Sequence, residues 1–294
     1  MNWDLLVAML INGVLVGGIY ALVAVGLTLI FGVMKIINFA HGTFMMLGMY
    51  ITYWLFALLN ADPYLSLLVC GPFLFVFGVF LQKVLIAPIL DAPEQSQILL
   101  TVGISIIIEN LALFLWSPDF RTVKTSLSGV VFPVGGAIMV SAPQLLAFMV
   151  ALAATGILYL FLKKTDTGKA MRACSEEREG ALLMGINPHR IYLLAFGIGS
   201  ACVGVAGALV LPFFYVSPFV GYTFVLTAFI VVVLGGMGNF VGALLGGLTI
   251  GIAESLAILI IRPSMRQLIP FGIFILVLFF KPEGLFSRRK KWVT

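Results

Sequence analysis

The polar residues that could do chemistry in this chain are few, and they interrupt long apolar segments. Lys35, Asn38 and His41 fall within seven residues, bracketed by Gly32 and Gly42. At membrane depth, such a polar and irregular stretch is tolerated only where protein or a water-filled cavity surrounds it. We therefore expect Asn38 and His41 to line a polar path through the protein. The alternative is an ordinary turn at the membrane face, with Lys35 as its anchor.

Four further amide and carboxylate side chains lie within apolar segments: Asn12, Glu109, Asn110 and Glu254. An ionisable group at membrane depth is costly, so it usually faces the interior of a helix bundle, where it is paired or wet. We expect these four residues to line the same path. A structural pairing, or closeness to a helix end, is the alternative.

The sequence lacks the motifs of several catalytic classes. It contains no GxxxxGK[ST] phosphate loop, no HExxH and no GxSxG elbow. His41 and His189 lie in different kinds of segment, and the three cysteines show no paired or metal-like spacing. We expect no enzyme activity, no metal and no cofactor held by this chain. Any ATP-driven work would then be delivered by a partner.

The composition indicates the class of protein that holds these residues. Hydrophobic residues make up 62% of the 294 residues and charged residues 10%, with a mean hydropathy of +1.16. Soluble domains carry about 25% charged residues, so this chain has too few charged residues to form the surface of a water-soluble fold. We expect an all-α, polytopic membrane bundle of eight to ten spans, with residues 1–294 forming one domain. The net charge of +5 then reflects basic residues at one membrane face rather than nucleic-acid binding.

Nine apolar segments predict the spans. They lie near residues 5–31, 42–59, 64–86, 97–116, 143–162, 190–211, 219–237, 240–261 and 266–280. Eleven of the 17 Lys and Arg residues fall in the 163–190 loop and the 281–294 tail, which we therefore assign to the cytosol. Counting spans back from that loop puts the 117–142 loop and the amino terminus outside.

Glycine spacing predicts close helix packing. Gly238, Gly242 and Gly246 recur at every fourth position, and Gly13 and Gly17 form another such pair. Small residues at this spacing let helix backbones approach one another in lipid. Plain packing is one interpretation, and sliding of helices as a pathway opens is the other.

The 163–190 loop has the features of a docking element. Basic and acidic residues alternate along it, and Glu179, Ala181 and Gly185 have the form E-x-A-x-x-x-G. We expect a short helix over 175–183, ended by Gly185 and the Asn187-Pro188 turn, that shows an acidic face beside an apolar one. Such a helix could enter a groove on another protein. Its mixed charge argues against a helix lying on lipid, because lipid-surface helices are usually basic.

With these residues in view, the chain resembles the permeases of bacterial ABC importers, and more narrowly the branched-chain amino-acid permease family, of which it looks like the shorter permease. The matching passages are LINGVLVGGIYALVAVGLTLIFGVMKIINFAHGTFMMLGMY, TVGISIIIEN, TGKAMRACSEEREGALLMGIN and VVVLGGMGNFVGALLGG, which together cover most of the chain. In the family's E-A-A-x-x-x-G loop, Gly180 replaces the middle alanine. The resemblance implies that this loop couples the permease to the ATPases. The expected coupling residues are Gly168, Arg172, Glu176, Glu179, Ala181, Gly185 and Asn187.

The resemblance also implies an assembly in the bacterial inner membrane, with the carboxyl terminus in the cytoplasm. Its expected members are a second homologous permease, two cytosolic ATPases that bind the ATP, and a periplasmic binding protein that delivers leucine, isoleucine or valine. We expect that binding protein to dock on the 117–142 loop and the 212–220 connection. Alternatives are the same importer class for urea, amides or aromatic acids, an ion-coupled secondary transporter, and a scaffold that transports nothing.

Overall fold

The computed structural model describes residues 3–134, 138–262 and 265–286, which are almost entirely helical. The helices are α1 (Trp3–Met34), α2 (His41–Leu59), α3 (Leu67–Leu81), α4 (Glu94–Trp116), α5 (Ala142–Lys164), α6 (Asp166–Glu176), α7 (Arg178–Leu183), α8 (Pro188–Val210), α9 (Val220–Gly235), α10 (Phe240–Ala257) and α11 (Leu268–Phe280). A π-helical turn (Gln82–Ile86) and a 3-10 turn (Ala87–Ile89) extend α3, and another 3-10 turn (Leu211–Phe213) extends α8.

Each of the nine predicted apolar segments coincides with one of these helices, so the polytopic all-α fold is confirmed. Among the described residues, seven helices are long and apolar enough to cross a membrane. The other two, α9 and α11, have 16 and 13 residues. Both fall short of the roughly 20 residues that a complete crossing takes.

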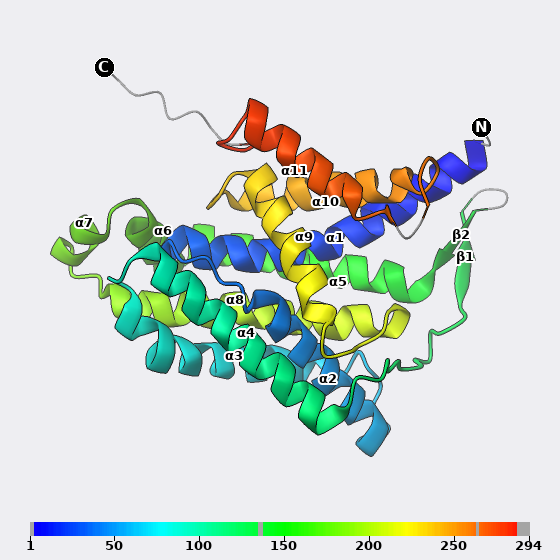
Figure 1. The fold of residues 1–294 in the computed structure, drawn as a ribbon, viewed down its shortest axis with the longest axis horizontal. Helices are drawn as coiled ribbons and strands as arrows, with labels where there is room; N and C mark the ends of the chain where they lie inside the picture. The colour runs from blue at the N-terminus through cyan, green and yellow to red at the C-terminus, as the bar shows by residue number, and fades with distance from the viewer. Residues whose placement is uncertain (1–2, 135–137, 263–264, 287–294) are drawn as a thin grey trace.

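Helix α1 forms the centre of the bundle. It is apolar on every side, and 83% of its most apolar 18-residue window is buried, as expected for a helix surrounded by others. Helices α10, α8, α5 and α9 all pack against it. In Figure 1, α1 crosses the middle of the molecule, with α10 and α11 on one side and α8 and α3 on the other.

Glycines set the closest of these contacts. A Cβ on Gly17 would lie 2.9 Å from the Gly247 carbonyl oxygen, so α1 and α10 touch backbone to backbone. On another face of α10, Gly242 and Gly246 meet α9. The third residue of the predicted run, Gly238, lies in the turn before α10 with φ +83°, so it is not part of that helix face.

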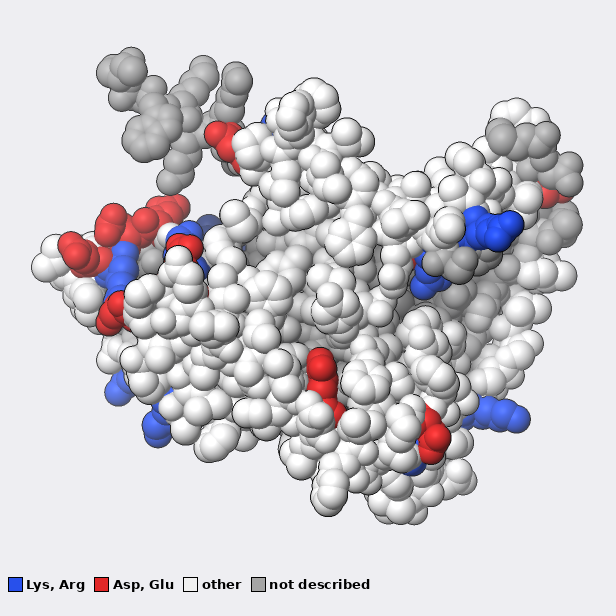
Figure 2. Space-filling model, in the orientation of Figure 1, with Lys and Arg blue, Asp and Glu red and all other residues white. Residues whose placement is uncertain are grey.

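The two ends of the bundle carry different structures. Helices α6 and α7 lie at one end, and the antiparallel strands β1 (Val131–Pro133) and β2 (Met139–Ser141) extend from the other (Figure 1). The strands pair Phe132 with Val140 and interrupt the predicted 117–142 loop, part of which lies outside the described residues. Figure 2 shows basic and acidic side chains together at the α7 end, while most of the remaining visible face is uncharged.

Candidate functional site

The break between α1 and α2 covers residues 35–40 and has an irregular backbone. Lys35 ends α1 in the left-handed conformation, with φ 59°, and its amide still bonds the Phe31 carbonyl at 2.8 Å. For a residue other than glycine this conformation costs about 1–2 kcal/mol. Such strain is retained where the surroundings require it, which supports a functional reason for the break.

Asn38 and His41, the two predicted path residues of this break, are fully buried. Asn38 Oδ1 accepts a hydrogen bond from the Ala40 amide at 3.1 Å, and His41 Nε2 lies 3.0 Å from the Val23 carbonyl oxygen. Asn38 Nδ2 and His41 Nδ1 have no hydrogen-bond partner among the described residues. His41 therefore holds the break against α1, while Asn38 bonds within the break, and each side chain keeps one polar atom without a partner among the described residues.

Two cavities flank the break. One, of about 280 Å³, is almost wholly apolar and is lined by aromatic residues such as Phe39 and Phe229. The other, of about 340 Å³, includes Lys35 and Glu94. Both contain Ile37, so they adjoin at the break. Asn38 and His41 line neither cavity. The adjacent residues Ile37 and Phe39 line the cavities instead.

The predicted path residues of α4 lie on a helix with few intramolecular contacts. Glu109 is half-buried, and its Oε1 lies 3.0 Å from Ser105 Oγ and 3.3 Å from Thr43 Oγ1. Asn110 is exposed and donates to the Ile106 carbonyl of its own helix at 2.8 Å. A carboxylate that contacts only hydroxyl groups on an uncovered helix face is costly in lipid, so we expect another subunit or water to surround it.

Asn12 and Glu254, by contrast, connect helices. Tyr20 donates a hydrogen bond to Glu254 Oε2 at 2.7 Å, and Arg266 Nε lies 3.1 Å from Oε1. About two turns earlier on α1, Asn12 donates to Ser255 Oγ at 3.2 Å. These contacts join α1 to α10 and favour the structural pairing that the sequence left open.

The charged loop forms two helices instead of the single helix expected over 175–183. The chain is extended at Glu177 (φ −152°, ψ 108°), which separates α6 from α7. This turn lets Arg178 bond Asp91 at 2.9 Å and lie 5.9 Å from the Tyr192 ring, while Ala181 is buried. The hydrogen bond that Arg178 donates to Asp91 also raises the pKa of the Arg178 guanidinium.

Apart from the buried Ala181, the predicted coupling residues fall into two groups. Gly168 and Asn187 have structural roles: a Cβ on Gly168 would lie 2.5 Å from the Leu162 Cα, and Asn187 Oδ1 caps α8 by accepting from the His189 amide. Arg172, Glu176 and Glu179 are exposed. The exposed group also includes Gly185, which follows α7 with φ +79° and has nothing within 4 Å of its Cβ position.

Sequence reasoning did not identify the most exposed apolar group at this end. Leu182 and Leu183 end α7 and Met184 follows it, and the Leu183 side chain is 89% exposed. Glu176, Glu177 and Glu179 come a few residues earlier in the chain and are also exposed, so acidic and apolar side chains follow one another along this segment. An apolar run directly before Gly185 was the available signal.

At the opposite end, the two segments expected to receive a binding protein are joined. Arg121 and Val216 exchange backbone hydrogen bonds of 3.0 and 2.9 Å. The Phe120 and Tyr215 rings meet edge to face, 4.8 Å apart. The 117–142 loop and the 212–220 connection therefore form one surface.

Comparisons with known proteins agree with the motifs. The family model described as "Branched-chain amino acid transport system / permease component" matches residues 9–278. The high-affinity branched-chain amino acid transport system permease protein BraD of Pseudomonas aeruginosa is 33% identical over 291 residues, covering 95% of each chain. LivH of Escherichia coli is 32% identical over 94% of each chain, and LivM of the same organism 27% identical over 91% of this chain and 67% of its own length. No solved structure matches the chain significantly.

Proposed function

Because the chain belongs to the family of branched-chain amino acid transport permeases, we propose that it is the membrane-spanning permease subunit of a bacterial ABC importer for leucine, isoleucine and valine. The observation that carries the proposal is the exposure of Leu182, Leu183 and Met184 at the end of α7, in a segment that also exposes three glutamates. Large apolar side chains exposed together at the charged end of a bundle are typical of a docking surface.

We infer that one of the assembly's two ATPase subunits binds α7, and that this end of the bundle and the carboxyl terminus are cytosolic. Arg288, Arg289, Lys290 and Lys291, which support that orientation, lie outside the described residues. The contacts of α6 and α7 explain how a movement of the bound ATPase would be passed from α7 to the membrane helices. Gly168 packs α6 on the end of α5, and Arg178 ties α7 to Asp91 and to α8. A displaced α7 would therefore move three parts of the bundle together.

A second permease of the same family would complete the pathway. Glu109 on the open face of α4 supports this, because a carboxylate facing lipid is costly. We place the entry surface for a periplasmic binding protein on the joined 117–142 and 212–220 segments. The solute would pass near the two adjoining cavities at the 35–40 break, where apolar walls suit aliphatic side chains and bind them weakly. This chain itself would bind no ATP or other cofactor.

The test replaces Gly185 with Glu in a chain co-expressed with its ATPase subunits. The new charge lies beside the exposed apolar residues of α7, so we expect the ATPases to be lost on purification while membrane insertion stays normal. Gly185→Asn is the matched control, because Asn tolerates the left-handed backbone that this position requires. Full ATPase stoichiometry with Gly185→Glu would contradict the proposal.

An ion-coupled transporter is the competing function. It would take up solute without any ATPase and respond to a proton or sodium gradient. Uptake by the purified chain in vesicles that lack ATPases separates the two functions.

A further inference from the structure

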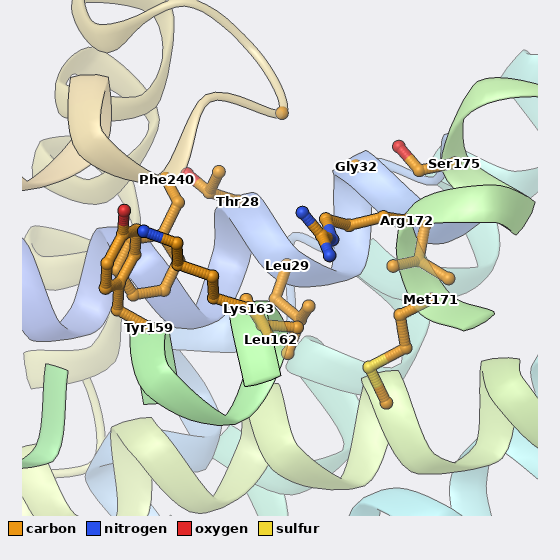
Figure 3. A pocket seen from close by; sticks show the side chains of 12 residues that line it. Thr28, Leu29, Gly32, Tyr159, Leu162, Lys163, Met171, Arg172, Ser175 and Phe240 are labelled. Atoms are coloured by element: carbon orange, nitrogen blue, oxygen red, sulfur yellow. The ribbon is translucent and has the colours of Figure 1, made fainter. Parts of the chain in front are cut away.

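A cavity of about 250 Å³ lies where the ends of α1 and α5 meet α6 and the turn before α10 (Figure 3). It is at the α6 and α7 end of the bundle, where the last turns of α1 and α5 meet α6. None of the paired networks described above reaches into it. Its lining combines charged, hydroxyl and apolar side chains, so it could select a ligand.

Two cations line the cavity without a counter-ion. Lys163 comes from the end of α5 and Arg172 from α6, and Figure 3 shows them on opposite sides of the space. Neither forms an ion pair with any residue that the structure describes, whereas Lys169 and Arg178 nearby are both paired. No carboxylate is among the residues lining the cavity. An anion is therefore the ligand that the charges favour.

A buried hydroxyl gives an independent indication. Thr28 lines the cavity and is 2% exposed, yet its Oγ1 has no hydrogen-bond partner among the described residues. Thr52 and Ser200 elsewhere in the bundle bond the carbonyl four residues earlier in the chain, whereas Thr155 Oγ1, which does not line this cavity, also has no partner among the described residues. An unsatisfied buried hydroxyl costs about 1–3 kcal/mol, which a ligand oxygen would relieve.

The rest of the lining defines the chemical class of the anion. Leu29, Leu162 and Phe240 form apolar walls next to the cations. The transported amino acids do not fit this pattern, because their ammonium group would meet two positive charges and no carboxylate. The volume is below the roughly 300–1,000 Å³ of sites that enclose a whole small molecule, so a headgroup-sized portion would enter. Basic pockets between helices at the cytosolic membrane face bind anionic lipid headgroups in this way.

We propose that this cavity binds the phosphate ester of an anionic phospholipid from the cytosolic leaflet. The proposal rests on the orientation given under the proposed function. Lys163 and Arg172 hold the phosphate from two helices, and the apolar walls contact the adjoining glycerol and acyl carbons. Because the ligand contacts α1, α5 and α6 together, it stabilises the position of α6, which connects α5 to α7.

The test measures melting temperatures of the full-length chain in detergent with phosphatidylglycerol, phosphatidylethanolamine or soluble glycerol 3-phosphate added. We expect phosphatidylglycerol to raise the melting temperature more than phosphatidylethanolamine at the same concentration. The double variant Lys163→Gln with Arg172→Gln should lose at least half of that shift. The control, Lys164→Gln with Arg190→Gln, changes the same charges at exposed positions outside the cavity and should keep it.

Ser175→Tyr provides a second variant, which fills the cavity without changing its charge and should lose the shift as well. A shift of equal size with glycerol 3-phosphate would support the phosphate site and identify a soluble ester as its source. Equal shifts from both lipids, or equal losses in both double variants, would overturn the proposal. The assay contains no ATPase and measures no uptake, so this result and the transport result can fail separately.

Discussion

Replacing Leu183 with Ser should weaken ATPase binding strongly without unfolding the permease. The Leu183 side chain is 89% exposed at the end of α7, so it makes almost no contact within its own chain. Fully burying a leucine side chain is worth about 1.5–3 kcal/mol. If a groove on the ATPase covers it, its loss should weaken the affinity roughly 10- to 100-fold, since about 1.4 kcal/mol corresponds to a factor of ten.

The assay is equilibrium binding of the purified ATPase to the detergent-solubilised permease. Ile260→Ser is the matched control, because that residue is 87% exposed and lies beyond α10 at the opposite end of the bundle. Both variants should have the melting temperature of the unaltered chain. An unchanged affinity for Leu183→Ser, or an equal loss in the control, would refute the assignment of α7 as the docking element.

The remaining predictions concern the interior. Arg266→Gln should lower the free energy of unfolding by about 1–2 kcal/mol, because the Glu254 carboxylate then keeps only Tyr20 as its partner among the described residues. The loss stays small because Arg266 is itself partly exposed. If the double variant Arg266→Gln with Glu254→Gln loses as much unfolding free energy as the two single variants added together, the two side chains are not coupled. Gly17→Leu should cost at least about 1–3 kcal/mol by overpacking α10, whereas Gly103→Leu, with open space around it, should cost little in the same unfolding assay. Asn38→Ala with His41→Ala should lower the uptake rate more than the amount of assembled complex, because both side chains position the break beside the two cavities; normal uptake would reduce them to members of an ordinary turn.

The spans were predictable from the sequence because lipid imposes both length and hydropathy on a helix. Residues 42–59 and 97–116 were expected as spans, and α2 and α4 begin and end within three residues of them. Strands β1 and β2 were not predicted. The apolar run at 130–132 before a Pro-Val-Gly-Gly stretch was a hairpin signal, weakened by its short length.

The site residues were harder to predict because long-range contacts decide their roles. Arg178 turns α7 by bonding Asp91, which is 87 residues away, and no local pattern indicates that partner. Glu254 could have lined a path or paired with another helix, and only its contact with Tyr20, 234 residues earlier, favours pairing. The anion cavity depends on residues from α1, α5 and α6, which the sequence alone could not bring together.

The contact between α1 and α10 has a consequence for biogenesis. The ribosome makes α1 first, but the glycine surface it fits, at Gly247 and Gly251, is synthesised more than 200 residues later. At roughly 5–20 residues per second, the nascent chain waits on the order of 10–40 seconds for that partner. During this interval the face of α1 that holds Gly13 and Gly17 is exposed to lipid or to an insertion chaperone. In a chain truncated before α10, this face would stay exposed permanently.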